Sequence, residues 1–88
     1  MKQVFKYRLD IHDQVDVIMP TGSTPIHAGE QDGVLKIWAE VDPHPSMMTT
    51  RRFAIRGTGH AVPLEGVYFR TVQMSSGLVW HVYDLGEL

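Results

Sequence analysis

The strict alternation of apolar and polar residues is the feature of this sequence that most constrains its fold. In residues 5–12, Phe5, Tyr7, Leu9 and Ile11 alternate with three charged residues and a histidine. Because successive side chains of a β-strand point to opposite faces, this pattern predicts a strand with one apolar face. No stretch has the i, i+3, i+4, i+7 apolar spacing of an amphipathic helix. Alternation returns in residues 15–19, 34–41, 52–56, 67–73 and 78–85.

Turn-forming residues join these segments into hairpins. Asp32-Gly33 lies between residues 26–30 and residues 34–41. Because Asp-Gly suits the two positive-φ positions of a type I′ turn, these segments are predicted to form a β-hairpin. Residues 74–77, which end in a glycine, predict a second hairpin between the last two strands.

Prolines separate the two halves of the pattern. Pro43 and Pro45 have no backbone N–H to donate to a neighbouring strand, and alternation resumes only at Arg52. Residues 42–50, which include Met47 and Met48, are therefore predicted to form a long loop.

The length of the chain allows one small domain. It has 88 residues and no cysteine, whereas domains typically hold about 100–200 residues. A core this small stabilises its fold only marginally, and no disulfide can add to it. Residues 1–88 are predicted to form a single all-β domain, a small antiparallel sandwich or barrel of six to seven short strands with little or no helix.

Charge and hydropathy exclude several classes of function. Eight Lys and Arg residues against ten Asp and Glu give a net charge of −2, which argues against general nucleic-acid binding. No apolar stretch approaches the ~18 residues of a membrane-spanning helix. Residues 1–8 mix charged and apolar side chains, unlike a secretory signal peptide, so a cytosolic location is expected.

The sequence predicts no metal site, no cofactor and no catalytic group. The five histidines lie at least fifteen residues apart, whereas zinc ligands usually come in closely spaced pairs. Strand pairing could still bring some of them together with Asp84. The sequence also lacks the G-x-S-x-G and H-E-x-x-H motifs, which favours a non-enzymatic function. The histidines are His12, His27, His44, His60 and His81.

A glycine-rich loop with nearby arginines is the candidate ligand site. Glycines let backbone N–H groups approach a phosphate closely, and arginine matches phosphate or carboxylate geometry. Such a site would hold a small anionic ligand, for example a cyclic nucleotide. The alternative is a corner turn beside a solvated strand face, with the arginines paired to Glu40 or Asp42. The candidate ligand-binding residues are Arg51, Arg52, Arg56, Thr58 and His60.

One tryptophan and two methionines are the candidate contacts for a protein partner. Within residues 34–41, Trp38 lies on the face opposite the apolar row that begins at Leu35. If that row faces the core, Trp38 lies on an outer surface, as binding hot spots often do. Met47 and Met48 offer adaptable apolar contacts in the predicted loop. Unprotected strand edges in so small a protein further predict a homo-oligomer.

The order of several short stretches points to a family. They are residues 19–22, 26–33, 38–43, 51–60, 71–73 and 79–81. The most specific are the loop Gly57-Thr58-Gly59-His60 and the Val-Trp-His sequence of residues 79–81. Taken together, over residues 6–84, they resemble a family of small proteins of unknown function encoded by tailed phages and prophages.

The resemblance implies a setting for the protein and no chemistry. Small phage proteins of this kind often act on the host by binding. We therefore expect a phage-derived, non-enzymatic counter-defence protein that binds and inhibits a host or defence protein in the cytoplasm of the infected bacterium. One alternative is the sequestration of an anionic, cyclic nucleotide signal. Another is a minor virion or assembly component, which would be located in the virion.

Overall fold

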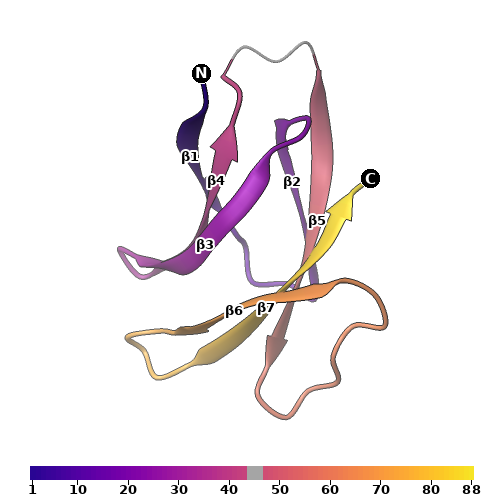
Figure 1. Ribbon diagram of the computed structural model, residues 1–88. Helices are drawn as coiled ribbons and strands as arrows, with labels where there is room; N and C mark the ends of the chain where they lie inside the picture. Colours follow the sequence, from indigo (N-terminus) through magenta and orange to yellow (C-terminus); the bar gives the residue numbers. More distant parts are fainter. Residues whose placement is uncertain (44–46) are drawn as a thin grey trace.

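The protein is all-β. The computed structural model describes residues 1–43 and 47–88, so that His44, Pro45 and Ser46 of the predicted loop lie outside the described residues. The described part of the chain forms seven strands and no helix (Figure 1). The strands are β1 (Gln3–Arg8), β2 (Gln14–Pro20), β3 (Thr24–Gln31), β4 (Val34–Val41), β5 (Met48–Gly57), β6 (Val67–Gln73) and β7 (Val79–Glu87).

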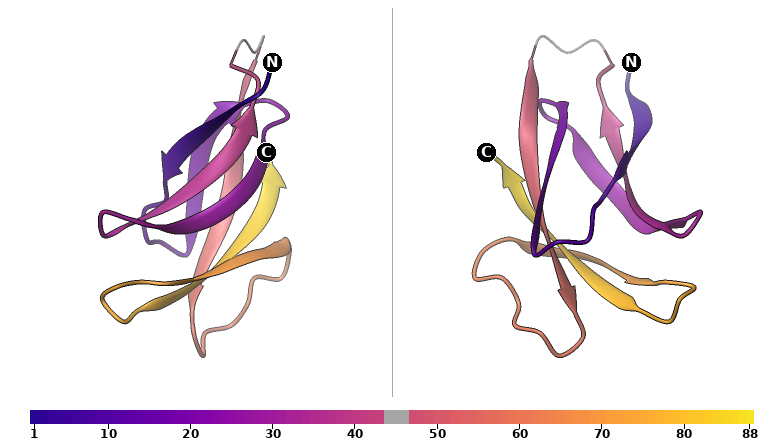
Figure 2. Two further views of the ribbon diagram at one scale, coloured as in Figure 1. Left: turned by 60° about the vertical axis from the view of Figure 1, so that its left-hand side comes forward. Right: turned by 180° about the vertical axis from the view of Figure 1, so that it is seen from behind.

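The strands form two antiparallel sheets in two layers. The three-stranded sheet has the order β1-β4-β3, and the four-stranded sheet has the order β2-β5-β7-β6. Figure 2 shows the two sheets from the side and from behind. The predicted all-β sandwich is therefore confirmed.

Both predicted hairpins are present. The turn between β3 and β4 has positive φ angles at Asp32 (55°) and Gly33 (77°), as a type I′ turn requires. Between β6 and β7, the N–H of Gly77 donates to the carbonyl of Met74 over 2.9 Å, and the N–H of Met74 donates to the carbonyl of Leu78 over 2.8 Å.

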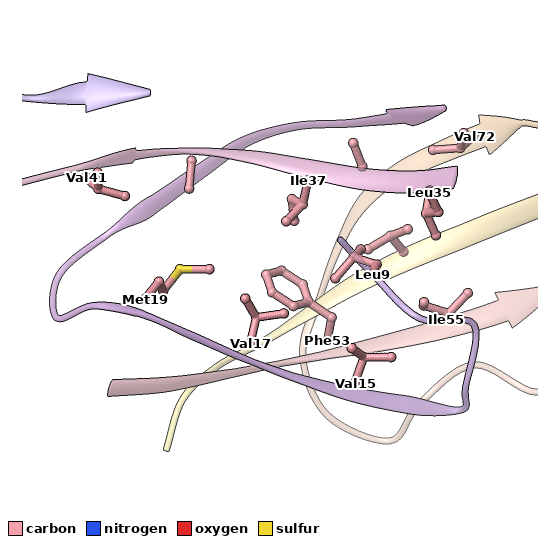
Figure 3. Packing of buried hydrophobic residues seen from close by; sticks show 13 residues of the cluster. Leu9, Val15, Val17, Met19, Leu35, Ile37, Val41, Phe53, Ile55 and Val72 are labelled. Atoms are coloured by element: carbon pink, nitrogen blue, oxygen red, sulfur yellow. The ribbon is translucent and has the colours of Figure 1, made fainter. Parts of the chain in front are cut away.

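The core lies between the inner faces of the two sheets. Phe53 of β5 is fully buried, and Figure 3 shows its ring between Val17 of β2 and Ile37 of β4. The predicted apolar row of residues 34–41 is confirmed, because none of its members is more than 2% exposed. The core residues are Leu9, Val15, Val17, Met19, Ala28, Leu35, Ile37, Ala39, Val41, Phe53, Ile55, Val72 and Val82.

The first strand is shorter than its alternation predicts. It ends at Arg8, although the pattern continues to residue 12. Leu9 is still buried, and its N–H donates to the carbonyl of Leu35 over 2.9 Å, but Ile11 is 42% exposed. The reason is topological: the chain leaves the three-stranded sheet here to enter the other sheet, so alternation no longer decides which side chains are buried.

The fifth strand begins earlier than predicted. Residues 48–51 belong to β5, whereas the sequence placed residues 42–50 in a loop. Thr49 and Thr50 lie opposite Met19 and Ile18 of β2 in the antiparallel register. Threonine is β-branched and favours strands, and pairing with β2 decides the matter. Met48 is therefore a strand residue and not a loop residue.

Along one side of the sandwich, hydrogen bonds join the two sheets. There β3 lies against β6, and Arg70 donates from Nη2 to the carbonyl of Ile26 over 3.2 Å. Glu30 of β3 accepts through Oε1 from the N–H of Ser75 over 2.9 Å. The strands β1 and β2 are the other edges of their sheets, and Phe5 of β1 remains 38% exposed.

Substitutions at two glycines, Gly66 and Gly77, allow the cost of backbone strain to be measured apart from the cost of steric crowding. Gly66 and Gly77 have similar φ angles, 102° and 97°. A Cβ at Gly66 would collide with Leu85 and lie 2.9 Å from the carbonyl oxygen of Asp84, whereas a Cβ at Gly77 would meet nothing within 4 Å. We expect Gly77→Ala to lower the free energy of unfolding by about 1–2 kcal/mol through strain alone. Gly66→Ala should lower it further, as measured by urea denaturation, and equal losses would contradict this.

Candidate functional site

Arg51 lies inside the sandwich and not at a ligand site. Its side chain, 17% exposed, forms an ion pair with Asp84, which is 16% exposed, over 2.8 Å. Its Nη1 lies 3.8 Å from Glu87 and donates to the carbonyl of Ser23 over 3.3 Å. This guanidinium therefore ties β5 to β7 and to the turn before β3, and its charge is balanced by two carboxylates.

Arg52 lies on the outer face of the four-stranded sheet, where its guanidinium group is paired with a neighbouring carboxylate. It donates from Nε and Nη2 to the two carboxylate oxygens of Asp16 over 2.8 and 3.1 Å. The hydrogen bond from Arg52 lowers the pKa of the Asp16 carboxyl below its ordinary value. The partner is thus Asp16 of β2, and not Glu40 or Asp42 as the sequence suggested.

Arg56 is held by backbone carbonyl groups, and no carboxylate of the described residues balances its charge. It donates from Nη1 to the carbonyl of Asp13 over 2.7 Å and from Nε to the carbonyl of Ala61 over 3.0 Å. A carbonyl group fixes the guanidinium without neutralising it. Arg56 therefore differs from Arg51 and Arg52, although the sequence grouped the three together.

The glycine-rich loop turns tightly after β5. The N–H of His60 donates to the carbonyl of Gly57 over 3.1 Å. A Cβ at Gly57 would lie 3.2 Å from Cε1 of the His60 ring, so this ring lies close against the end of β5 and would have to shift slightly to admit a side chain there.

The loop forms one wall of a cleft of about 220 Å³ on the outer face of the four-stranded sheet; we call it the basic cleft. Three predicted ligand-binding residues line it (Arg56, Thr58 and His60), whereas Arg51 and Arg52 do not. The complete lining is Arg56, Gly57, Thr58, Gly59, His60, Val62, His81 and Tyr83.

Sequence analysis missed His81 and Tyr83 as cleft residues. Both alternate with the buried Val82, which places them on the outer face of β7. The register then puts His81 directly opposite Arg56 of β5. Only this long-range pairing shows that the two side chains share a cleft with the glycine-rich loop.

Hydroxyl groups hold the His81 ring on both sides. Its Nε2 lies 2.9 Å from Oγ1 of Thr58, and its Nδ1 lies 2.9 Å from Oγ1 of Thr71. The hydroxyl of Tyr68 lies a further 2.8 Å from Oγ1 of Thr71. Because hydroxyls both donate and accept hydrogen bonds, this row of hydrogen-bonded side chains accommodates either tautomer of the His81 imidazole.

A second cleft adjoins the first on the other side of the loop; we call it the Trp80 cleft. Its volume is about 340 Å³, and it shares Gly57, Thr58 and His60 with the basic cleft. The remaining lining residues are Gly77, Leu78, Val79 and Trp80.

The three predicted partner contacts do not form one surface. Trp38 is half-buried on the outer face of the three-stranded sheet, opposite Lys6 and His27 in the register. Its ring centroid lies 5.6 Å from that of His27. Met48 lies on the outer face of the other sheet, on the far side of the sandwich, and Met47 immediately precedes it.

Met48 belongs to a surface of mixed apolar and polar side chains that the sequence did not reveal; we call it the Ile18 face. Ile18 and Met48 are 65% and 54% exposed. They line a shallow groove of about 570 Å³ beside the Asp16–Arg52 ion pair. The groove residues are Asp16, Ile18, Met48, Thr49, Thr50 and Leu88.

Strand pairing brings His60 and His81 to one cleft but does not add His27 or Asp84 to them. His27 lies in the three-stranded sheet, whereas His81 lies in the other sheet and Asp84 is paired with Arg51. Among residues 1–43 and 47–88, no three His, Asp or Glu side chains lie together so that they could hold a metal ion. The same residues contain no helix that is long and apolar enough to cross a membrane.

Comparison with known proteins identifies a family. Residues 1–87 match the model of a domain of unknown function, DUF7352. The match covers almost the whole chain, so the protein belongs to this family. No curated protein and no solved structure matches the chain.

The two ion-paired arginines should differ in their effect on stability. Arg51→Met leaves the carboxylate of Asp84, 16% exposed, without its cation. Breaking such a pair is strongly destabilising, and we expect a loss of about 3 kcal/mol in the free energy of unfolding. Arg52→Met, the matched control, breaks a more exposed pair and should cost much less. Chemical denaturation of both variants decides, and similar losses would refute the assignment of Arg51 to the interior.

The lowered pKa of Asp16 gives a pH-dependent prediction. Because its folded-state pKa lies below its unfolded-state pKa, the pair with Arg52 stabilises the fold above the unfolded-state value. This contribution is lost as pH falls through the folded-state pKa. In Arg52→Gln, the Asp16 pKa should rise towards its ordinary value in an NMR titration. An unchanged pKa would show that the hydrogen bonds from Arg52 do not cause the shift.

Proposed function

We propose that this protein is a phage-derived, non-enzymatic binding protein that acts on the bacterial host by inhibiting a host or defence protein. The observation that supports this most is the Ile18 face. There Ile18 and Met48 are each more than half exposed and line one groove. Single exposed apolar residues are ordinary, but a group of them with a polar rim is typical of a protein-binding surface.

The composition of the Ile18 face suits a protein partner. The Asp16–Arg52 ion pair borders the apolar side chains, and arginine is enriched in interfaces, where its fork gives geometric specificity. The groove lies on a sheet face, where strand side chains of β2 and β5 stand in regular rows. An apolar ridge of a partner could dock between these rows.

The second outer face offers a surface for self-association. Trp38 is half-buried there, between Lys6 and His27 in the register, and Lys36 on the same face has no ion-pair partner among the described residues. Because this face and the Ile18 face lie on opposite sides of the sandwich, one can contact a host protein while the other contacts a second copy. A homo-oligomer is therefore part of the proposal.

A capture experiment in the host tests the proposal. Tagged wild-type protein expressed in the host should recover one stoichiometric protein partner. Ile18→Ser and Met48→Ser should each weaken the complex about tenfold or more, because interface centres carry most of the binding energy. The matched control is Val4→Ser, which changes an exposed apolar residue of β1, 53% exposed, on the other sheet.

Two results would contradict the proposal. One is the absence of any partner that depends on Ile18 and does not depend on Val4. The other is recovery of the protein in purified phage particles, which would identify it as a virion component. Inhibition of the captured partner in a purified assay would complete the support.

A further inference from the structure

We propose that the basic cleft and the Trp80 cleft together bind one nucleoside phosphate, with the phosphate in the basic cleft and the base beside Trp80. This site is separate from the Ile18 face. Met48 and Gly57 mark opposite ends of the ten-residue strand β5, which spans about 30 Å. The two sites can therefore be tested independently.

The charge of the basic cleft suits a phosphate. Its ionisable lining residues are Arg56, His60, His81 and Tyr83, and the lining contains no carboxylate. The lining of the Trp80 cleft likewise contains no carboxylate. Guanidinium, imidazole and hydroxyl groups can all donate hydrogen bonds to phosphate oxygens. Both ring nitrogens of His81 already contact the hydroxyls of Thr58 and Thr71. The donors for a phosphate are therefore Arg56, His60 and Tyr83.

Arg56 is the cation best placed to meet that phosphate. Three carboxylates balance Arg51 and Arg52, whereas the hydrogen bonds of Arg56 all go to backbone carbonyls. These bonds use Nε and Nη1 and fix the guanidinium plane. Its Nη2 makes no hydrogen bond within residues 1–43 and 47–88 and remains for an anion. A fixed, charged donor binds an anion with little loss of side-chain entropy.

The Trp80 cleft supplies a surface for a base. Trp80 and Leu78 line it, and Trp80 packs against the hydrophobic core, which fixes its ring. Stacking of a base on an aromatic ring contributes about 1–3 kcal/mol. Trp80 lies opposite the buried Val72 in the register, so its ring is on the inner side of β7, whereas His81 is on the outer side. An aromatic cleft and a basic cleft on either side of the Gly57–His60 loop therefore match the two ends of a nucleotide that bends over this loop.

The two clefts meet at the residues that they share. Thr58 and His60 line both, so a ligand that spans the clefts must pass over these two side chains. The basic cleft alone, about 220 Å³, is smaller than the usual range of about 300–1,000 Å³ for small-molecule sites, whereas the Trp80 cleft, about 340 Å³, lies at the lower end of that range. A ligand that fills only one of the two clefts should therefore bind more weakly than a ligand that fills both.

Fluorescence of Trp80 offers a direct test. In a Trp38→Phe background, Trp80 is the single remaining tryptophan. Nucleoside 5′-monophosphates and 3′,5′-cyclic monophosphates should change its emission and raise the melting temperature. Inorganic phosphate or a nucleoside alone should bind at least tenfold more weakly, because each fills one cleft. The tighter binder of the two classes shows whether the site prefers a linear or a cyclic nucleoside monophosphate.

Variants assign the binding to the proposed residues. Arg56→Gln should weaken nucleotide binding at least tenfold, and His60→Ala should do the same without removing the hydrogen bonds of Arg56 to Asp13 and Ala61. The matched control, Arg52→Gln, removes an arginine that Asp16 already neutralises and should leave binding unchanged.

Three outcomes would overturn the inference. They are no emission or melting change with any nucleotide at millimolar concentration, inorganic phosphate binding as tightly as the nucleotide, and equal losses in Arg56→Gln and Arg52→Gln. Ile18→Ser should bind nucleotide like the wild type. Failure of the nucleotide site and failure of the host-protein proposal are thereby distinguishable.

Discussion

The burial of one apolar face of each sheet against the other is the interaction on which the structure depends. The inner rows of β2, β4 and β5 meet around Phe53, which is fully buried (Figure 3). An 88-residue chain without cysteine has no second core and no disulfide to replace this layer. The inner-facing positions at the centre of the sheets are thus committed to packing, and the outer faces, the loops and the ends of the sheets are left for binding.

The strand β5 shows how this division sorts similar residues. Arg51 faces inward and is neutralised by Asp84 and Glu87. Arg52, one residue later, faces outward, where a single carboxylate occupies it. Arg56 also faces outward, but it reaches only carbonyl groups and keeps its charge. Position along one strand thus decides whether an arginine stabilises the fold or can attract a ligand.

The sequence predicted the local features of the fold and three residues of the basic cleft, Arg56, Thr58 and His60. Alternation identified the buried row of β4, and Asp32-Gly33 identified its turn, because both depend on neighbouring residues alone. The place of His81 beside Arg56 depends on the β5–β7 register, which pairs residues 25 positions apart. For the same reason alternation could not show that the chain changes sheets after Leu9.

The Ile18 face and the basic cleft follow from how the outer face of the four-stranded sheet is covered. At the Met48 end of β5, the apolar side chains of Ile18 and Met48 remain exposed to solvent. At the Gly57 end, the glycine-rich loop folds back, and Arg56 fastens it to Asp13 through the carbonyls of Ala61 and Asp13. A flat, open face suits a protein, whereas a face walled by a fixed loop suits a small molecule. The loop therefore turns one end of a uniform sheet into a chemically distinct cleft without disturbing the core beneath it.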